Sequence, residues 1–183
     1  YINHIWSYDF LKDQTEDGRP LKMLPVLDEY TRESLAIDVE RSITAKDVIG
    51  VLGYLFAIRG APAYIRSDNG PEFIAEAIKG WLVDSGVGTL YIEPGSPWEN
   101  GYMESFIGHF EDELLNGELF GNVREAKVLV ERHRLEYNSI RPHSSLGYMT
   151  PAAFAASCLA SAPASSGPSP TPNRTQSVDN SLI

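Results

Sequence analysis

The chain has 183 residues, 43% of them hydrophobic, which is enough for one domain with a buried core. Its single cysteine, Cys158, excludes a disulfide framework or a cysteine-based zinc site within the chain. Without an apolar run of about 18 residues or a signal peptide, we expect a soluble, cytoplasmic protein with no membrane partner. The net charge of −10 argues against a broad basic face for nucleic acid, although it leaves room for a local basic groove.

The N-terminal part predicts three strands joined by short turns. The first is rich in aromatic residues and has Asp9 as its lone acid, and a turn over residues 13–20 follows it. Pro25 in the second strand cannot donate to a ladder and predicts a bulge or an edge position. The strands are expected at residues 4–11, 21–27 and 34–39. Their short connections predict an antiparallel meander.

Helices and short strands alternate after the meander. Thr44 and Asp47 form a capping-box pattern that opens the first helix. Helices are expected at residues 44–60, 71–86, 99–116 and 123–138, and strands at residues 63–66 and 89–92. The predicted fold class is α/β, with a mixed five-stranded sheet flanked by helices and strands 1–3 antiparallel. Residues 1–154 are expected to form the core, and the Ala-, Ser- and Pro-rich residues 155–183 a disordered tail.

Three acids are placed where this fold would bring them together. Asp9 lies in the first strand, Asp68 follows the neighbouring fourth strand, and Glu104 lies on a helix that crosses the same edge. Converging carboxylates repel one another unless hard cations neutralise them, which favours Mg²⁺ or Mn²⁺ and, for phosphoryl transfer, two ions. The alternatives are a strand acid in an ion pair for Asp9, a turn residue for Asp68 and a solvated helix acid for Glu104.

The motifs around these acids carry a family resemblance, and thirty-five residues separate Asp68 from Glu104. In chain order the motifs are Trp6-Ser7-Tyr8-Asp9, Val26-Leu27-Asp28 with Thr31-Arg32, Arg66-Ser67-Asp68-Asn69-Gly70-Pro71-Glu72-Phe73, Pro94-Gly95-Ser96-Pro97-Trp98-Glu99-Asn100-Gly101, Glu104-Ser105-Phe106, Asp112-Glu113, Tyr137-Asn138, Arg141-Pro142-His143-Ser144-Ser145-Leu146-Gly147 and Thr150-Pro151. Over residues 4–154 the chain resembles the integrase core, or catalytic domain, of bacterial insertion-sequence transposases of the second-reading-frame (OrfB) type. These belong to the retroviral-integrase-like DDE superfamily.

The resemblance implies a ribonuclease H-like fold in which Asp9, Asp68 and Glu104 are the catalytic, metal-binding triad. It implies DNA strand cleavage and strand transfer without a covalent protein intermediate, with Mg²⁺ or Mn²⁺ as cofactor. The implied partners are the element ends and target DNA, further copies of the chain in a synaptic complex, and an upstream helix-turn-helix region or first-frame protein. The implied location is the bacterial cytoplasm, at the nucleoid when DNA is bound. Because the chain begins at Tyr1, we expect sequence to precede it.

Four further residues are candidates for DNA contact. Asn69 and Asn100 would contact DNA or orient metal-bound water, or else serve as a turn residue and a helix cap. Trp98 would stack on DNA or pack beneath its loop. Arg141 would reach a phosphate or, as we favour, fix the fold beyond the last helix.

One position departs from the family pattern. Glu111 shares a helix face with Glu104, where the family usually carries a basic residue that contacts DNA phosphate. An alternative function is therefore a catalytically weakened DNA- or protein-binding remnant of such a transposase. A ribonuclease H-type hydrolase shares the fold and metals, but the loop and C-terminal motifs favour a transposase.

Overall fold

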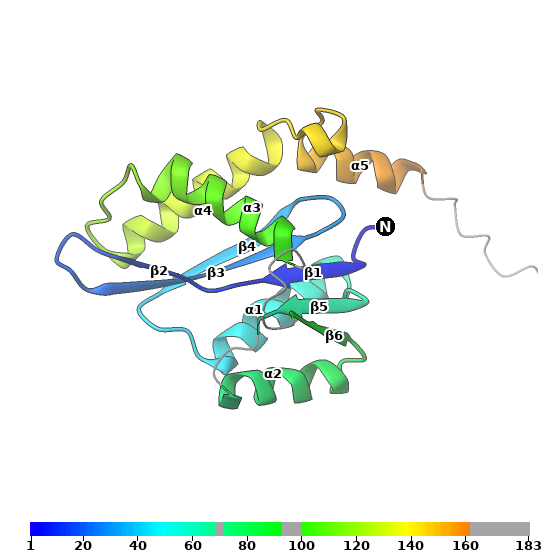
Figure 1. Ribbon diagram of the computed structural model, residues 1–183, viewed down its shortest axis with the longest axis horizontal. Coiled ribbons are helices and arrows are strands. Elements are labelled where there is room, and N and C mark those ends of the chain that lie inside the picture. Colours follow the sequence, from blue (N-terminus) through cyan, green and yellow to red (C-terminus); the bar gives the residue numbers. More distant parts are fainter. Residues whose placement is uncertain (69–71, 93–99, 162–183) are drawn as a thin grey trace, which may run out of the picture.

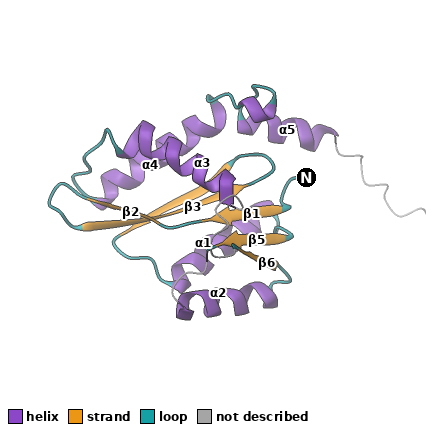
Figure 2. Cartoon of the chain, viewed as in Figure 1, coloured by secondary structure: helices purple, strands orange, loops and turns teal. Residues whose placement is uncertain are grey.

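The computed structural model describes residues 1–68, 72–92 and 100–161. The chain forms three layers, with a six-stranded sheet between two layers of helices (Figures 1 and 2). Its elements are β1 (Ile5–Tyr8), β2 (Leu11–Gln14), β3 (Pro20–Asp28), β4 (Ser34–Glu40), α1 (Ala45–Arg59), β5 (Tyr64–Ser67), α2 (Glu72–Asp84), β6 (Gly88–Tyr91), α3 (Gly101–Phe110), α4 (Val123–Ser139) and α5 (Pro151–Ser161). The α/β prediction with an antiparallel start is confirmed.

Each face of the sheet has its own hydrophobic core. On one face, α1 and α2 cover Trp6, Leu24 and Val26 (Figure 1). On the other face, α3 and α4 cover Met23 and Leu27. Neighbouring residues of β3 thus alternate between the two cores, as the pleat of a strand requires. In the described residues, no helix is both long enough and apolar enough to cross a membrane.

The first expected strand, residues 4–11, is divided into two, so the sheet has six strands instead of five. Tyr8 of β1 lies opposite Val26, and Leu11 of β2 lies opposite Met23, so both strands pair with β3 in a single antiparallel register. Continuing that register places Asp9 opposite Pro25, which has no N–H to donate. The ladder is interrupted there, and the Phe10 N–H instead donates to the Asp9 Oδ1 at 2.7 Å.

Pro25 itself lies inside β3 and not at a sheet edge. β4 covers its other side, where Pro25 pairs with Ile37. The expected bulge does occur, one residue further on, as a register shift between Val26 and Leu27 in the pairing with β4. Pro25 is tolerated because the missing donor falls at the break between β1 and β2.

Local sequence signals account for several element ends. The capping box at the start of α1 is confirmed, with the Asp47 N–H donating to Thr44 Oγ1 at 3.4 Å and the Thr44 N–H to Asp47 Oδ2 at 2.8 Å. Gly86, at φ 71°, follows α2 as expected for a residue that ends a helix. The expected turn over residues 13–20 is shorter, because β2 extends through Gln14.

The C-terminal helices differ from expectation in two respects. The helix predicted to run to Asn116 is α-helical to Phe110 and continues as a π-helical turn over Glu111–Leu115. A 3₁₀ turn, Ser144–Leu146, and then α5 follow α4. The expected boundary between core and tail at residue 155 falls inside α5, where Ala155 is buried. The rest of the expected tail, residues 162–183, lies outside the described residues.

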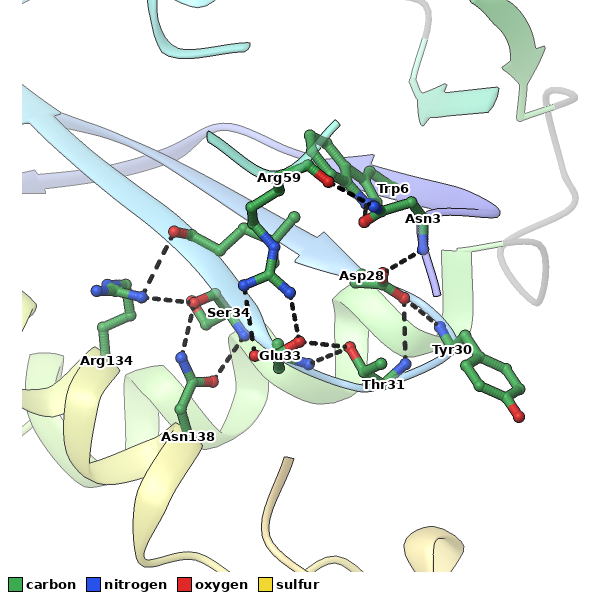
Figure 3. Close-up of polar contacts among 11 residues, drawn as sticks. Asn3, Trp6, Asp28, Tyr30, Thr31, Glu33, Ser34, Arg59, Arg134 and Asn138 are labelled. Atoms are coloured by element: carbon green, nitrogen blue, oxygen red, sulfur yellow. Dashed lines mark hydrogen bonds and ion pairs between the residues drawn. The ribbon is translucent and has the colours of Figure 1, made fainter. Parts of the chain in front are cut away.

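Buried acids hold the turn between β3 and β4 (Figure 3). The carboxylate of Asp28, which is 0% exposed, accepts backbone N–H bonds from Asn3 at 2.9 Å, Tyr30 at 2.8 Å and Thr31 at 3.1 Å. Glu33 forms an ion pair with Arg59 of α1 at 2.6 Å. These contacts tie the turn to the N-terminus and to α1.

Candidate active site

Asp9 and Asp68 each follow directly after a strand at the same edge of the sheet. β1 and β5 are parallel neighbours, with Trp6 opposite Ile65 and Ser7 opposite Arg66. Continuing this register by two residues brings Asp9 level with Asp68. Because carboxyl ends of parallel strands meet at one edge, the two aspartates are neighbours through backbone pairing alone. Asp9 was expected in the middle of a strand, but it lies just after the end of β1.

The electrostatics of Asp9 link all three acids. Burial is the largest cause that raises the pKa of Asp9, and the charges of Asp68 and Glu104 raise it further. The hydrogen bond from the Phe10 N–H acts in the opposite direction and lowers that pKa. Glu104 lies in the first turn of α3 and is exposed. The carboxylates of Asp68 and Glu104 therefore lie within electrostatic reach of the half-buried Asp9.

The donor set at this edge suits a hard divalent cation. Three carboxylates provide the oxygen ligands that Mg²⁺ and Mn²⁺ prefer, and their mutual repulsion would be relieved by a cation. Within the described ranges, no three Asp, Glu, His or Cys side chains are close enough to hold one metal ion as they stand. The three acids lie in one region and offer the same kind of oxygen ligand, but their carboxylates are not close enough together to hold one metal ion as they stand.

A buried tyrosine beside these acids was not identified from sequence. Burial is the main cause that raises the pKa of Tyr8, which Asp68, Tyr91 and Asp9 raise further, while a hydrogen bond with the Ser67 side chain lowers it. Tyr8 is thus a neutral phenol at the end of β1, adjacent to Asp9 in the chain and within electrostatic reach of Asp68. The position of Tyr8 just before Asp9 could have indicated this role, but its aromatic side chain was interpreted only as typical of a strand.

Asn100 stands at the N-cap position of α3 but does not act as a cap. Its side chain makes no capping hydrogen bond, and its φ of −106° and ψ of 15° differ from the extended backbone usual there. The side chain is buried at 7% exposure, and among the described residues its Oδ1 has no hydrogen-bond partner. The capping alternative is therefore wrong, and a buried acceptor remains at the start of the helix that carries Glu104.

Of the other three candidate DNA contacts, the structure describes only Arg141. Arg141 is half-buried, forms an ion pair with Glu113 and lies 3.2 Å from His109 Nδ1 through its Nη2. These contacts join the segment after α4 to α3 and the π-helical turn, as expected for a residue that fixes the fold. Asn69 and Trp98 lie outside the described residues.

Comparison with known proteins gives a consistent family. Two models, both described as integrase core domain, match residues 2–97 and 85–151. An insertion element IS476 protein of Xanthomonas euvesicatoria is 43% identical over 154 residues, covering 84% of this chain and 44% of the relative. An insertion element IS407 protein of Burkholderia multivorans is 40% identical over 162 residues, covering 88% and 58%. The chain spans about half the length of these relatives.

Solved structures show the same fold. The HTLV-2 integrase catalytic core in complex with magnesium aligns with a TM-score of 0.63 at 16% identity, covering 83% of this chain and 95% of that one. The catalytic core of BIV integrase aligns with a TM-score of 0.63 at 19% identity, covering 86% and 97%. The expected ribonuclease H-like fold is thereby confirmed. Together with the family models and the insertion-element relatives, this places the chain in the integrase core domain family, with the catalytic domains of insertion-sequence transposases.

Proposed function

We propose that this domain carries out divalent-metal-dependent cleavage and joining of DNA strands, with Asp9, Asp68 and Glu104 as its metal-binding triad. The observation that carries the proposal is the meeting of Asp9 and Asp68 at the carboxyl ends of paired parallel strands, within reach of the Glu104 charge. A triad of this kind attracts cations and repels the DNA phosphates that are its substrate. Turnover therefore requires the metal.

The residues have distinct tasks in this proposal. Asp9 is held by the Phe10 N–H, which fixes the direction of its carboxylate. Glu104 and Asp68 are exposed, so that both are open to solvent and substrate. When bound, the divalent ions stabilise charge on the attacking and leaving oxygens of an in-line displacement. The buried Oδ1 of Asn100 can accept a hydrogen bond, so it is suited to orienting an N–H or O–H donor close to Glu104.

The proposed reaction is a pair of phosphodiester displacements. In the first, the oxygen of water bonds to phosphorus, the bond to a 3′ oxygen breaks, and the resulting 3′ hydroxyl keeps one proton while the other leaves to solvent. In the second, that 3′ hydroxyl attacks a phosphodiester of the target strand and displaces a second 3′ oxygen. Each step forms and breaks one P–O bond, so the joining needs no cofactor for energy.

Metal binding and turnover test this proposal separately. Titration calorimetry with Mn²⁺ should show binding by the unaltered chain and by Asp84→Asn, an exposed acid at the end of α2. Asp68→Asn should lose most of this binding, and its strand-transfer activity on element-end DNA should fall by at least about 100-fold. Undiminished Mn²⁺ binding and undiminished strand transfer by Asp68→Asn would refute the triad.

Larger assemblies follow from the same proposal. The HTLV-2 core is described in trimeric and dimeric forms, and a simian T-cell lymphotropic virus intasome aligns with a TM-score of 0.66 at 17% identity, covering 97% of this chain and 60% of that one. We extend this to a synaptic complex of several copies on element ends and target DNA. Because the matched region covers only 44% and 58% of these relatives, an upstream DNA-reading region or first-frame protein is proposed to supply sequence specificity.

Glu111 supports a second candidate, a weakened remnant that binds DNA with little turnover. Glu111 is exposed at the first residue of the π-helical turn, seven positions after Glu104 on the same continuous helix. Its negative charge opposes a DNA phosphate approaching that face. Strand transfer by the unaltered chain at a rate that Glu111→Arg does not raise would reject this candidate.

A further inference from the structure

A polar pocket lies against α3, and the proposed triad does not line it. Its volume is about 500 Å³, and four parts of the chain form it: the β3–β4 turn, one side of α3, Tyr137 of α4 and the segment after α4. The cationic and the hydrogen-bonding aromatic residues among those that line it include Arg32, Tyr102, His109, Arg141, His143 and Tyr148. Tyr102 and His109 are seven positions apart on α3 and share a face, while Glu104 lies on a different face of the same helix.

Arg32 is a cation of this pocket that forms no ion pair among the described residues, although its charge reaches the Glu29 carboxylate, which is paired with Arg66. Its guanidinium carbon lies 3.4 Å from the centre of the Tyr102 ring, in a cation–π contact. Across the described ranges, no carboxylate forms an ion pair with Arg32, and its buried Nη1 has no hydrogen-bond partner. Arg141, by contrast, is already paired with Glu113. The pocket therefore holds a positive charge with unused N–H donors.

The two histidines add donors without adding charge. Burial and then the charge of Arg141 lower the pKa of His109. The same two causes, followed by His109 and Arg32, lower the pKa of His143. Both rings are therefore neutral near pH 7, and each carries one N–H. The Nε2 of His143 is buried and has no hydrogen-bond partner among the described residues.

The backbone holds this pocket in an uncommon conformation. The described residues include three non-glycine residues with positive φ, and two of them line the pocket: Arg32 at 62° and Tyr148 at 64°. Such conformations persist where the surrounding structure enforces them and concentrate at functional sites. Here the Asp28 carboxylate fixes the turn through Tyr30 and Thr31 (Figure 3). The Arg32 N–H donates to the Asp28 carbonyl at 2.8 Å. Arg32 is thereby presented before any ligand arrives.

We propose that this pocket binds a phosphate group of the DNA on which the proposed triad acts. The proposal rests on the function proposed above and adds a contact on the face of α3 that points away from Glu104. A phosphate accepts hydrogen bonds from the guanidinium, imidazole N–H groups and hydroxyls that line the pocket. Tyr102 and Tyr148, at 48% and 76% exposure, flank it with rings on which a sugar or base can stack.

DNA binding without metal tests the pocket apart from the triad. Fluorescence anisotropy with a labelled oligonucleotide in EDTA would compare Arg32→Gln with Arg132→Gln, a matched loss of charge on an exposed part of α4 that does not line the pocket. Arg32→Gln should weaken binding at least about five-fold and reduce the slope of log K against log salt by about one, whereas Arg132→Gln should stay within about two-fold. Equal effects of the two substitutions would overturn the proposal.

Inorganic phosphate is the second probe and separates the possible outcomes. Phosphate should raise the melting temperature of the unaltered chain and of Arg132→Gln above its value in chloride of equal ionic strength, but not that of Arg32→Gln. If Arg32→Gln removes the phosphate effect and leaves DNA affinity unchanged, the pocket holds free phosphate and the assignment to DNA is wrong. If the unaltered chain binds neither probe, the pocket is not a phosphate site.

Two further variants keep the test independent of folding and of catalysis. Tyr102→Ala truncates a half-exposed side chain and should weaken DNA binding in the same direction as Arg32→Gln. Asp68→Asn should retain DNA binding in EDTA even if strand transfer is lost. A failure of Asp68→Asn to alter Mn²⁺ binding would therefore count against the triad and leave the Arg32 result intact.

Discussion

Replacing Asp28 should reveal how strongly one buried carboxylate organises the β3–β4 turn. Asp28→Ala leaves three backbone N–H groups without their acceptor, those of Asn3, Tyr30 and Thr31. Asp28→Asn is the graded comparison, because its single oxygen can still accept from Tyr30 and Thr31. Its amide NH₂ would then face the Asn3 N–H, so that two donors oppose each other.

The magnitude follows from the burial of each donor. The Thr31 N–H is buried, and losing a charged acceptor there costs about 1.5–3 kcal/mol. The other two donors are part-buried, so water compensates in part and each costs about 0.5–1 kcal/mol. Asp28→Ala should therefore lower the free energy of unfolding by about 2.5–5 kcal/mol, and Asp28→Asn by about 1–2 kcal/mol. The larger loss corresponds to a melting temperature lower by roughly 10 °C.

Urea unfolding near pH 7 measures these losses. Asp84→Ala is the control, since it removes an exposed acid at the end of α2 and should stay within about 0.5 kcal/mol of the unaltered chain. If Asp28→Ala lowers the free energy of unfolding by less than about 1 kcal/mol, the assumption that each N–H left without an acceptor has its own cost is wrong. Equal losses for the Asn and Ala variants would show that the charge matters and the individual acceptors do not.

Two further predictions concern the candidate site. Burial and then the charges of Asp68 and Glu104 raise the pKa of Asp9, so the folded protein keeps the Asp9 proton to higher pH than the unfolded chain. The protonated Asp9 carboxyl therefore favours the folded state. This contribution to stability is complete below the usual pKa of 3.8 and is lost as the pH rises through the pKa of Asp9 in the folded state. Metal-free Asp9→Asn should thus be more stable than the unaltered chain near pH 7, with a gap in urea unfolding that closes toward pH 3.8, and a pH-independent gap would contradict this. Glu111→Arg should tighten DNA binding and steepen its salt slope by about one to two, while Glu118→Arg, the same charge change beyond the end of the helix, should do less.

Local signals in the sequence were sufficient to predict most elements of this fold. The Thr44 and Asp47 capping box, the glycine after α2 and the strand before Asp68 each depend on a few neighbouring residues, and the structure follows them. The division of the first strand depends instead on a residue sixteen positions away, because Pro25 interrupts the ladder opposite Asp9. That relation exists only after the strands are in register, and the strand's own composition does not contain it.

The candidate site was predictable to a similar degree. The pairing of β1 with β5 agrees with the expected meeting of Asp9 and Asp68, because a parallel neighbour brings both to one edge. The N-cap role considered for Asn100 failed, since a capping residue type does not guarantee extended backbone at that position. Arg32 was one residue of a motif with no assigned role. Its importance comes from its stacking on Tyr102 and from segments more than 100 residues apart, such as the segment around His143, which local patterns do not join.

The pairing of β1 with β5 also bears on how the protein folds. The hairpins of the meander close over short stretches of chain, whereas the β1–β5 ladder must bring together segments 59 residues apart. Such long closures are entropically costly and slow, so they tend to follow the local ones. We expect Asp9 and Asp68 to be brought together late in folding. The like charges would then come together only once a formed hydrophobic core is present to hold them.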